Sequence, residues 1–423
     1  MNDIDNNIPK SFYLKIYLSA VIFVFLFELC YHKILLQLSL PTIRLIQSHI
    51  LDSPLSILIL RIFTECGTKF GTLSTLFLTY VFMDIKQSFI ILNVVSLGVY
   101  LDNVLKNVYG NPRPYMLDIL IHPIDCEISF GNPSGHSLNS IALFLSVWHI
   151  VTDSDYFKTR KIWKYILLCF TITFVLMIMF SRLAFGVHSL NQLLFGFTIG
   201  IIIYYGVFHI LEVNNWDTTE FFNKFSDNLL SNVMIFTLMI LFNIFLILFN
   251  KHDMSKYDNI LHERCPHKAI SILKFDFSSN AGGFLIFLAI GSYFGIYSLV
   301  KHVNRESNNT SEDPIVRTLE YTELNNWNDL ELKNVLIRVI LFTLCSLPVL
   351  ISDTLSNKHS MFTNFFLKII IPNFIASFLI YYPAILIYIK NKIKYEGSGN
   401  MEENVIKSKD VVEEYKKVSI AEI

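Results

Sequence analysis

The sequence predicts an all-α fold, a polytopic transmembrane helix bundle of about nine or ten spans. The first observation is composition: 53% of the 423 residues are hydrophobic and only 16% are charged, whereas a soluble domain is about one quarter charged. The second is that apolar stretches of the length a spanning helix needs, roughly 20 residues, recur along the chain. The net charge of -1 predicts no nucleic-acid partner, because no basic surface is available.

Ten stretches qualify as spans, in this order: Phe12–Tyr31, Leu55–Met83, Phe89–Leu105, Ser137–Val151, Ile162–Phe180, Leu190–Leu211, Val233–Phe249, Ala281–Val300, Val335–Ile351 and Phe362–Ile389. The first resembles a signal peptide. It contains Glu28 and has no clear cleavage site flanked by small residues, so we expect a retained anchor.

The second stretch, Leu55–Met83, carries Arg61, Glu65 and Lys69 at four-residue spacing. Side chains at this spacing lie near one helix face and can pair. We expect an interfacial first half followed by a true span. The alternative is a charged face that turns toward a polar cavity.

Positive charge in short loops predicts the orientation of the bundle. Basic residues cluster after the fourth span and after the last span, at Lys158, Arg160, Lys161, Lys390, Lys392 and Lys394. Both clusters are expected in the cytosol. Six predicted spans lie between them, and an even number of spans returns the chain to the same side of the membrane. The loop from Lys301 to Asn334 is then also cytosolic, so its glycosylation sequons at Asn308 and Asn309 should be unused.

The predicted domain organisation has three parts. Residues 1–53 form an N-terminal cytosolic segment with the extra anchor span and a loop. Residues 54–390 form the membrane domain, and residues 391–423 form a charged, disordered cytosolic tail. None of the six cysteines has C-x-x-C spacing, which argues against a zinc site. Cys126 and Cys265 fall on the non-cytosolic side, where a disulfide is permitted, but we expect two separate thiols.

Three polar islands interrupt the apolar chain on that same non-cytosolic side: Lys106 to Pro114, Pro133 to His136, and Ser181-Arg182 with His188. Ionisable groups at membrane depth are costly and usually mark function. A phosphate monoester carries nearly two negative charges, and Lys106, Arg113 and Arg182 are suited to bind them. The islands therefore predict a phosphate-binding site.

The second island supplies backbone donors for the same phosphate. Ser134 and Gly135 lie where a loop enters a helix, and the N–H groups at a helix N-terminus bind anions. Gly135 also allows the backbone to approach the phosphate closely. We expect His188 to attack phosphorus as the nucleophile and His136 to act as general acid and then base. No metal and no cofactor is expected, because the three cations neutralise the developing charge.

The motifs K-x6-R-P, P-S-G-H and S-R-x5-H, in this order, resemble the type 2 phosphatidic acid phosphatase superfamily. Cys126-Glu127 before the second motif, Gln192 after His188, and Arg264-Cys265-Pro266 further on are similar to glucose-6-phosphatases. This resemblance implies an endoplasmic-reticulum enzyme of about nine spans with a lumenal active site. Such an enzyme hydrolyses glucose 6-phosphate that a separate transporter supplies. The resemblance assigns the same roles to Lys106, Arg113, Arg182, His136 and His188.

The extra N-terminal span departs from the glucose-6-phosphatase pattern. Most of the superfamily also has an aspartate where this chain has Gln192, so we expect Gln192 to orient His188 as a neutral hydrogen-bond acceptor. Two alternatives to a sugar phosphatase remain open. One is a lipid phosphate phosphatase with the same cations and histidines, and the other is a non-catalytic phosphate-binding membrane protein.

Overall fold

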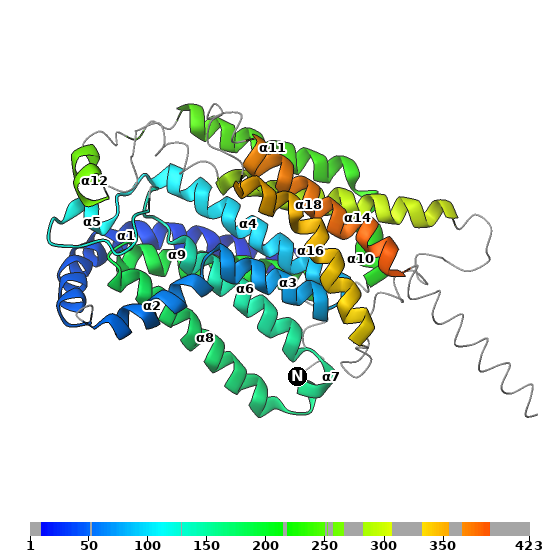
Figure 1. Ribbon diagram of the computed structural model, residues 1–423, viewed down its shortest axis with the longest axis horizontal. Helices are drawn as coiled ribbons and strands as arrows, with labels where there is room; N and C mark the ends of the chain where they lie inside the picture. Colours follow the sequence, from blue (N-terminus) through cyan, green and yellow to red (C-terminus); the bar gives the residue numbers. More distant parts are fainter. Residues whose placement is uncertain are drawn as a thin grey trace, which may run out of the picture.

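The computed structural model describes residues 10–50, 53–127, 129–214, 218–249, 252, 257–265, 282–306, 332–354 and 366–389. Every regular element in these ranges is helical, and eight of the helices are long and apolar enough to cross a membrane. The prediction of an all-α, multi-pass membrane protein is confirmed. Figure 1 shows the long helices gathered into one bundle.

In chain order the helices are α1 (Lys10–Ile50), α2 (Pro54–Cys66), α3 (Lys69–Phe82), α4 (Ile85–Tyr109), α5 (Pro114–Leu117), α6 (Gly135–Thr152), α7 (Asp155–Lys158), α8 (Lys161–Ala184), α9 (Leu190–Asn214), α10 (Thr218–Asp227), α11 (Leu229–Phe249), α12 (Asp258–Arg264), η3 (Gly282–Leu285), α14 (Ile286–Glu306), α16 (Leu332–Thr354), η6 (Phe366–Ile370) and α18 (Ile371–Tyr381).

The predicted span Leu55–Met83 is two shorter helices. Gly67 ends α2, and the Thr68 hydroxyl caps α3 by accepting a hydrogen bond from the Phe70 N–H. Threonine is a favoured residue at this capping position. Neither half has the length of a span, and this is one reason why eight helices qualify instead of nine or ten. The charged side chains at positions 61, 65 and 69 are all exposed, so they are not buried among the other helices.

Helix α6 is the centre of the fold, although it is not among the eight. Leu138 and Ala142 pack into the apolar cluster formed with α3, α4, α9 and α18. Ile141 and Leu145 pack into the cluster formed with α1, α2 and α8. These four residues follow the i, i+3, i+4, i+7 spacing of a single helix face, so one face of α6 contacts both halves of the core. The N-terminus of α6 carries the P-S-G-H island.

Two glycines bring α9 against the start of α6. A Cβ atom on Gly196 would lie 2.5 Å from the Ser134 carbonyl oxygen, and one on Gly200 would lie 2.4 Å from the Leu138 carbonyl oxygen. Any larger residue would therefore separate the two helices. Small residues at four-residue spacing are a common solution for close helix packing in membranes. This approach fixes the third island, which precedes α9, beside the second.

The polar islands and the basic loop lie at opposite ends of the bundle. Figure 1 shows α5 and α12 at one end and α7, which is followed by Arg160 and Lys161, at the other. This agrees with the predicted separation of the two groups across the membrane. The sequons at Asn308 and Asn309, the lysines after Ile389 and the tail lie outside the described residues.

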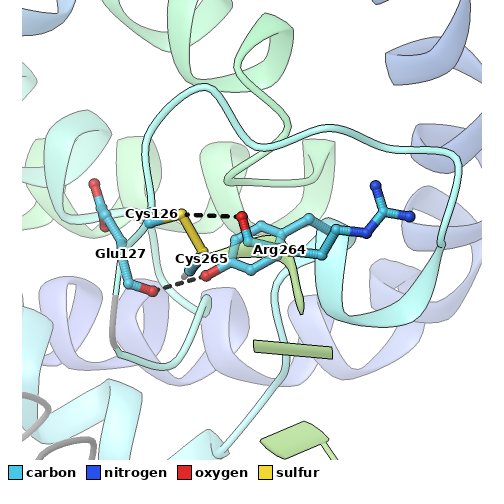
Figure 2. The surroundings of a disulfide bond; sticks show 5 residues. Cys126, Glu127, Arg264 and Cys265 are labelled. Carbon is cyan, nitrogen blue, oxygen red and sulfur yellow. Dashed lines mark hydrogen bonds between the residues drawn. A yellow bond between two sulfur atoms is a disulfide. The ribbon is translucent and has the colours of Figure 1, made fainter. Parts of the chain in front are cut away.

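Cys126 and Cys265 form a disulfide bond, so the expectation of two separate thiols is wrong. Cys265 follows α12 directly, and α12 packs beside the loop that carries Cys126 (Figure 2). The two cysteines are 139 positions apart in the sequence. Their proximity depends on the packing of α12, which no local pattern predicts.

Candidate active site

The first island begins where α4 ends. Asp84 and Gln87 form a capping box at the start of α4, and Gly110 ends it in the left-handed conformation with φ 57°. Glycine adopts this conformation without steric cost. Lys106 therefore occupies the last turn of a well-defined helix. Its Nζ lies 2.8 Å from Asp102 Oδ2 on the preceding turn, and both side chains are buried.

Arg113 is completely buried directly after α4. Its guanidinium donates to the Ser129 carbonyl at 2.8 Å and to the Ser129 hydroxyl at 2.7 Å. It also donates to the Val187 carbonyl at 3.1 Å. Because Ser129 precedes the second island and Val187 precedes His188, this one side chain binds all three islands together. Its fixed fork geometry makes this set of bonds specific to arginine.

Backbone hydrogen bonds also connect the islands. The Gly131 N–H donates to the Asn111 carbonyl at 2.8 Å, and the Ser134 N–H donates to the Gln192 carbonyl at 2.9 Å. The first bond joins the first and second islands, and the second bond joins the second and third. The convergence expected from the sequence is therefore present in the structure.

His188 is held in one orientation through its Nδ1 atom. This nitrogen lies 3.0 Å from the Gly131 carbonyl oxygen and 3.3 Å from Gln192 Oε1. Both partners are acceptors, so Nδ1 carries the proton and Nε2 presents its lone pair. The Arg113 Nη1 atom lies 3.1 Å from that Nε2. The nitrogen predicted to be the nucleophile and a cation predicted to bind phosphate are thus adjacent.

The P-S-G-H island forms the start of α6. Ser134 is the helix N-cap and its hydroxyl accepts from the Ser137 N–H. A Cβ atom on Gly135 would lie 2.5 Å from Asp102 Oδ2, so only glycine allows the loop to lie against the Asp102–Lys106 pair. His136 follows in the first turn, and its Nε2 has no hydrogen-bond partner among the described residues.

Arg182 lies in the last turn of α8 and is buried. Its Nη1 atom is 3.0 Å from Asp125 Oδ2, and its Nη2 atom pairs with Glu127 Oε1. Glu127 Oε2 in turn lies 2.7 Å from Arg113 Nη2. The carboxylate of Glu127 therefore bridges two of the three cations that the sequence predicts to bind phosphate.

The pKa values of the loop residues follow from this arrangement. Burial alone would raise the pKa of Glu127, but the adjacent Arg113 and Arg182 guanidinium groups hold it well below its usual range. Burial and the charge of Arg113 lower the pKa of His188 well below its usual range. Both effects favour the neutral form of His188, the protonation state that a nucleophile requires.

All seven predicted site residues lie within this one region, and the charges of the three cations act on both histidines. Sequence reasoning missed the acids that pair with the cations, Asp102 and Asp125, and the carbonyl of Gly131. Asp102 precedes Lys106 by four positions, a spacing that favours an ion pair, so this pair had a sequence signal. The described residues contain no group of three or more His, Cys, Asp or Glu side chains that could hold a metal ion.

We predict that Gln192→Ala lowers kcat by about tenfold, because several contacts of the site pass through this amide. Its oxygen contacts His188 Nδ1 and accepts from the Ser189 N–H, while its Nε2 donates to the Pro112 carbonyl at 2.9 Å. The Gly131 carbonyl still holds His188 in the variant, so the loss is partial. Steady-state kinetics of folded protein measures it, and unchanged turnover would contradict a role for Gln192.

Known proteins match the part of the chain that holds this site. Residues 87–216 match the family model of the PAP2 superfamily, and this range includes every predicted catalytic and phosphate-binding residue. The chain is 29% identical over 109 residues to "Lipid phosphate phosphatase delta" of Arabidopsis thaliana. That alignment covers 25% of this chain and 26% of the relative, so it spans about a quarter of the relative's length.

A solved structure is also similar. It is the crystal structure of the first transmembrane PAP2 type phosphatidylglycerolphosphate phosphatase from Bacillus subtilis, at 22% identity and a TM-score of 0.40. The match covers 46% of this chain and 96% of that one. The family-model match alone supports the resemblance noted in the motifs, at the level of the superfamily and for residues 87–216.

Proposed function

We propose that this multi-pass membrane protein hydrolyses a phosphate monoester, with glucose 6-phosphate as the leading substrate, through a phosphohistidine intermediate and without a metal ion. The observation that carries the proposal is the pairing of His188 Nε2 with Arg113 at 3.1 Å. A neutral imidazole nitrogen beside a buried cation is the arrangement needed to attack a phosphorus atom whose oxygens that cation binds.

In the first step the phosphate binds to Arg113, Arg182 and Lys106 and to the N–H groups at the start of α6. His188 Nε2 attacks phosphorus and forms the P–N bond while the P–O bond to the alcohol breaks. Burial and the charge of Arg182 lower the pKa of His136 to about 3 in the free site. The bound phosphate dianion therefore has to raise this pKa, so that His136 takes up a proton and gives it to the leaving alkoxide oxygen. The charge that develops on the equatorial oxygens is stabilised by the fixed cations.

In the second step a water molecule replaces the alcohol. His136, now neutral, accepts a proton from the water as its oxygen attacks phosphorus. The P–N bond breaks, and inorganic phosphate and neutral His188 are released. The hydrogen bond from Nδ1–H to the Gly131 carbonyl is retained throughout, so His188 keeps the same tautomer in both steps.

The two candidate substrate classes are sugar phosphates and lipid phosphates. Gln192 and the Cys126-Glu127 sequence support the sugar phosphate through their similarity to glucose-6-phosphatases. The Arabidopsis relative is named a lipid phosphate phosphatase, which supports a lipid phosphate as the second candidate. Both substrates present the same phosphate monoester, so the catalytic residues do not separate them.

A direct comparison of substrates tests the proposal. Membranes that contain the chain are opened with detergent, treated with a chelator, and given glucose 6-phosphate or phosphatidic acid. We expect phosphate release from glucose 6-phosphate at a rate above that from the lipid. Release from phosphatidic acid alone would keep the mechanism and replace the substrate. Release from neither, by folded protein, would favour the non-catalytic phosphate-binding alternative.

The same proposal places the protein in the endoplasmic reticulum membrane, with the active site facing the lumen. A sugar phosphate made in the cytosol must then cross the membrane, so activity in sealed vesicles depends on a separate sugar-phosphate transporter. Latency tests this arrangement: glucose 6-phosphate hydrolysis in sealed vesicles that lack the transporter should rise when detergent opens them.

A further inference from the structure

A carboxylate of the chain itself occupies the two arginines that would bind the substrate phosphate. Glu127 Oε2 lies 2.7 Å from Arg113 Nη2, and Glu127 Oε1 pairs with Arg182 Nη2. The two arginine side chains are 0% and 1% exposed. A carboxylate presents two oxygens to guanidinium groups in the same way as a phosphate. Glu127 therefore satisfies the donors that a phosphate would need.

The described site is balanced in charge before any substrate binds. Lys106 pairs with Asp102, Arg182 pairs with Asp125 and Glu127, and Arg113 pairs with Glu127. Three acids thus face three cations. A dianionic phosphate added to this set would bring two more negative charges into a buried region. This is unfavourable unless one of the three carboxylates moves away from the cations.

Of the three acids, Glu127 is the one that would release the largest number of cationic side chains if it moved away. Asp102 is fixed on the same helix as Lys106, and its side chain is only 8% exposed. Asp125 is bonded only to Arg182 among the described ion pairs. Glu127 bonds both arginines, and its side chain is 27% exposed on a loop. A single rotation of this side chain toward solvent would release both guanidinium groups.

The backbone of Glu127 is held by contacts that do not involve its side chain. The Tyr115 hydroxyl donates to the Glu127 carbonyl oxygen at 2.8 Å. The preceding residue, Cys126, is bonded to Cys265 (Figure 2). The tether keeps Glu127 next to the arginines, so the carboxylate can return whenever the phosphate leaves.

We infer that Glu127 is an internal anion that occupies the substrate-phosphate position and selects against weakly charged ligands. This inference rests on the proposed function of the same site. A phosphate monoester dianion bonds both arginines with more charge than Glu127 and displaces it. A phosphate diester carries one negative charge, the same as Glu127, and gains no electrostatic advantage over it. Glu127 thus contributes to specificity for monoesters.

Binding of inorganic phosphate and of dimethyl phosphate tests the inference without turnover. The purified full-length chain in detergent is unfolded by heat at increasing concentrations of each anion, because a ligand stabilises the state it binds. In Glu127→Gln we expect the Kd of phosphate to fall by about tenfold. We also expect dimethyl phosphate, which leaves the wild type unchanged, to raise the unfolding temperature of the variant.

Glu263→Gln is the matched control, because it removes the same charge at an exposed position of α12, two residues from the other half of the disulfide. It should leave both affinities unchanged. A phosphate Kd in Glu127→Gln that equals or exceeds the wild-type value would overturn the inference. If Glu127→Gln does not fold, Glu127→Asp takes its place. The shorter aspartate side chain can contact only one of the two arginines, so phosphate should again bind more tightly than in the wild type.

The proposed function and this inference fail in distinguishable ways. A wild-type chain that neither binds inorganic phosphate nor releases it from any monoester would remove the proposed function. A wild-type chain that binds phosphate and turns over a monoester, with an unchanged or weaker phosphate affinity in Glu127→Gln, would keep the function and remove only the role of Glu127.

Discussion

His188→Ala is expected to lower phosphate release by about 10⁴-fold or more, the scale at which loss of a covalent nucleophile is felt. The side chain is buried, its Nδ1 is bound to the Gly131 carbonyl and its Nε2 faces Arg113. The neutral nitrogen has no substitute in the variant. Arg113 and Arg182 remain, so inorganic phosphate should still bind even though turnover is lost.

The intermediate itself provides a second measurement. With a substrate labelled on its phosphate, the wild type quenched in alkali should carry label on His188, since a phosphohistidine survives alkali and is lost in acid. His188→Ala should carry none. His149→Ala is the matched control, because His149 lies 13 positions beyond His136 on α6 and bonds the Tyr204 hydroxyl at 2.9 Å. It should retain both label and turnover. Label that persists in His188→Ala would show that another residue is the nucleophile.

The fold class and the location of the site could be predicted from the sequence because both depend on local signals. Apolar length indicates a membrane span, and a buried cation or histidine in such a chain indicates function. The break between α2 and α3 also had a signal, since Gly67 and Thr68 are a helix end and a helix cap. The apolar residues on either side of Gly67 and Thr68 nevertheless favoured a single continuous span in the prediction.

The rest could not be predicted because it depends on contacts between distant parts of the chain. The Asn132 Nδ2 atom donates to Glu28 Oε1 at 3.0 Å, which ties α1 to the P-S-G-H loop across 104 positions. The sequence shows Glu28 only as a charge in an apolar stretch. The bridge from Glu127 to two arginines likewise needs the end of α8 and the loop after α4 to be adjacent, and this adjacency follows from helix packing.

Replacement of Arg113 by lysine is expected to lower kcat/KM by about 100-fold, even though the positive charge is kept. Arg113 donates to the Ser129 carbonyl, the Ser129 hydroxyl and the Val187 carbonyl while its Nη1 faces His188. Lysine has a single ammonium and cannot reproduce a planar fork with five donors. The variant should therefore lose the alignment of the three islands in addition to a phosphate ligand.

The pattern of kinetic change distinguishes alignment from charge. A fall in kcat together with a higher KM is expected for Arg113→Lys, because the nucleophile and the phosphate are both displaced. Arg44→Lys is the matched control: Arg44 on α1 pairs with Asp118, but its side chain is 45% exposed, and exposed ion pairs contribute at most about 1 kcal/mol. It should leave both parameters nearly unchanged. Wild-type kinetics in Arg113→Lys would mean that charge alone is required at this position, and that the hydrogen bonds of Arg113 to the three islands do not position the nucleophile.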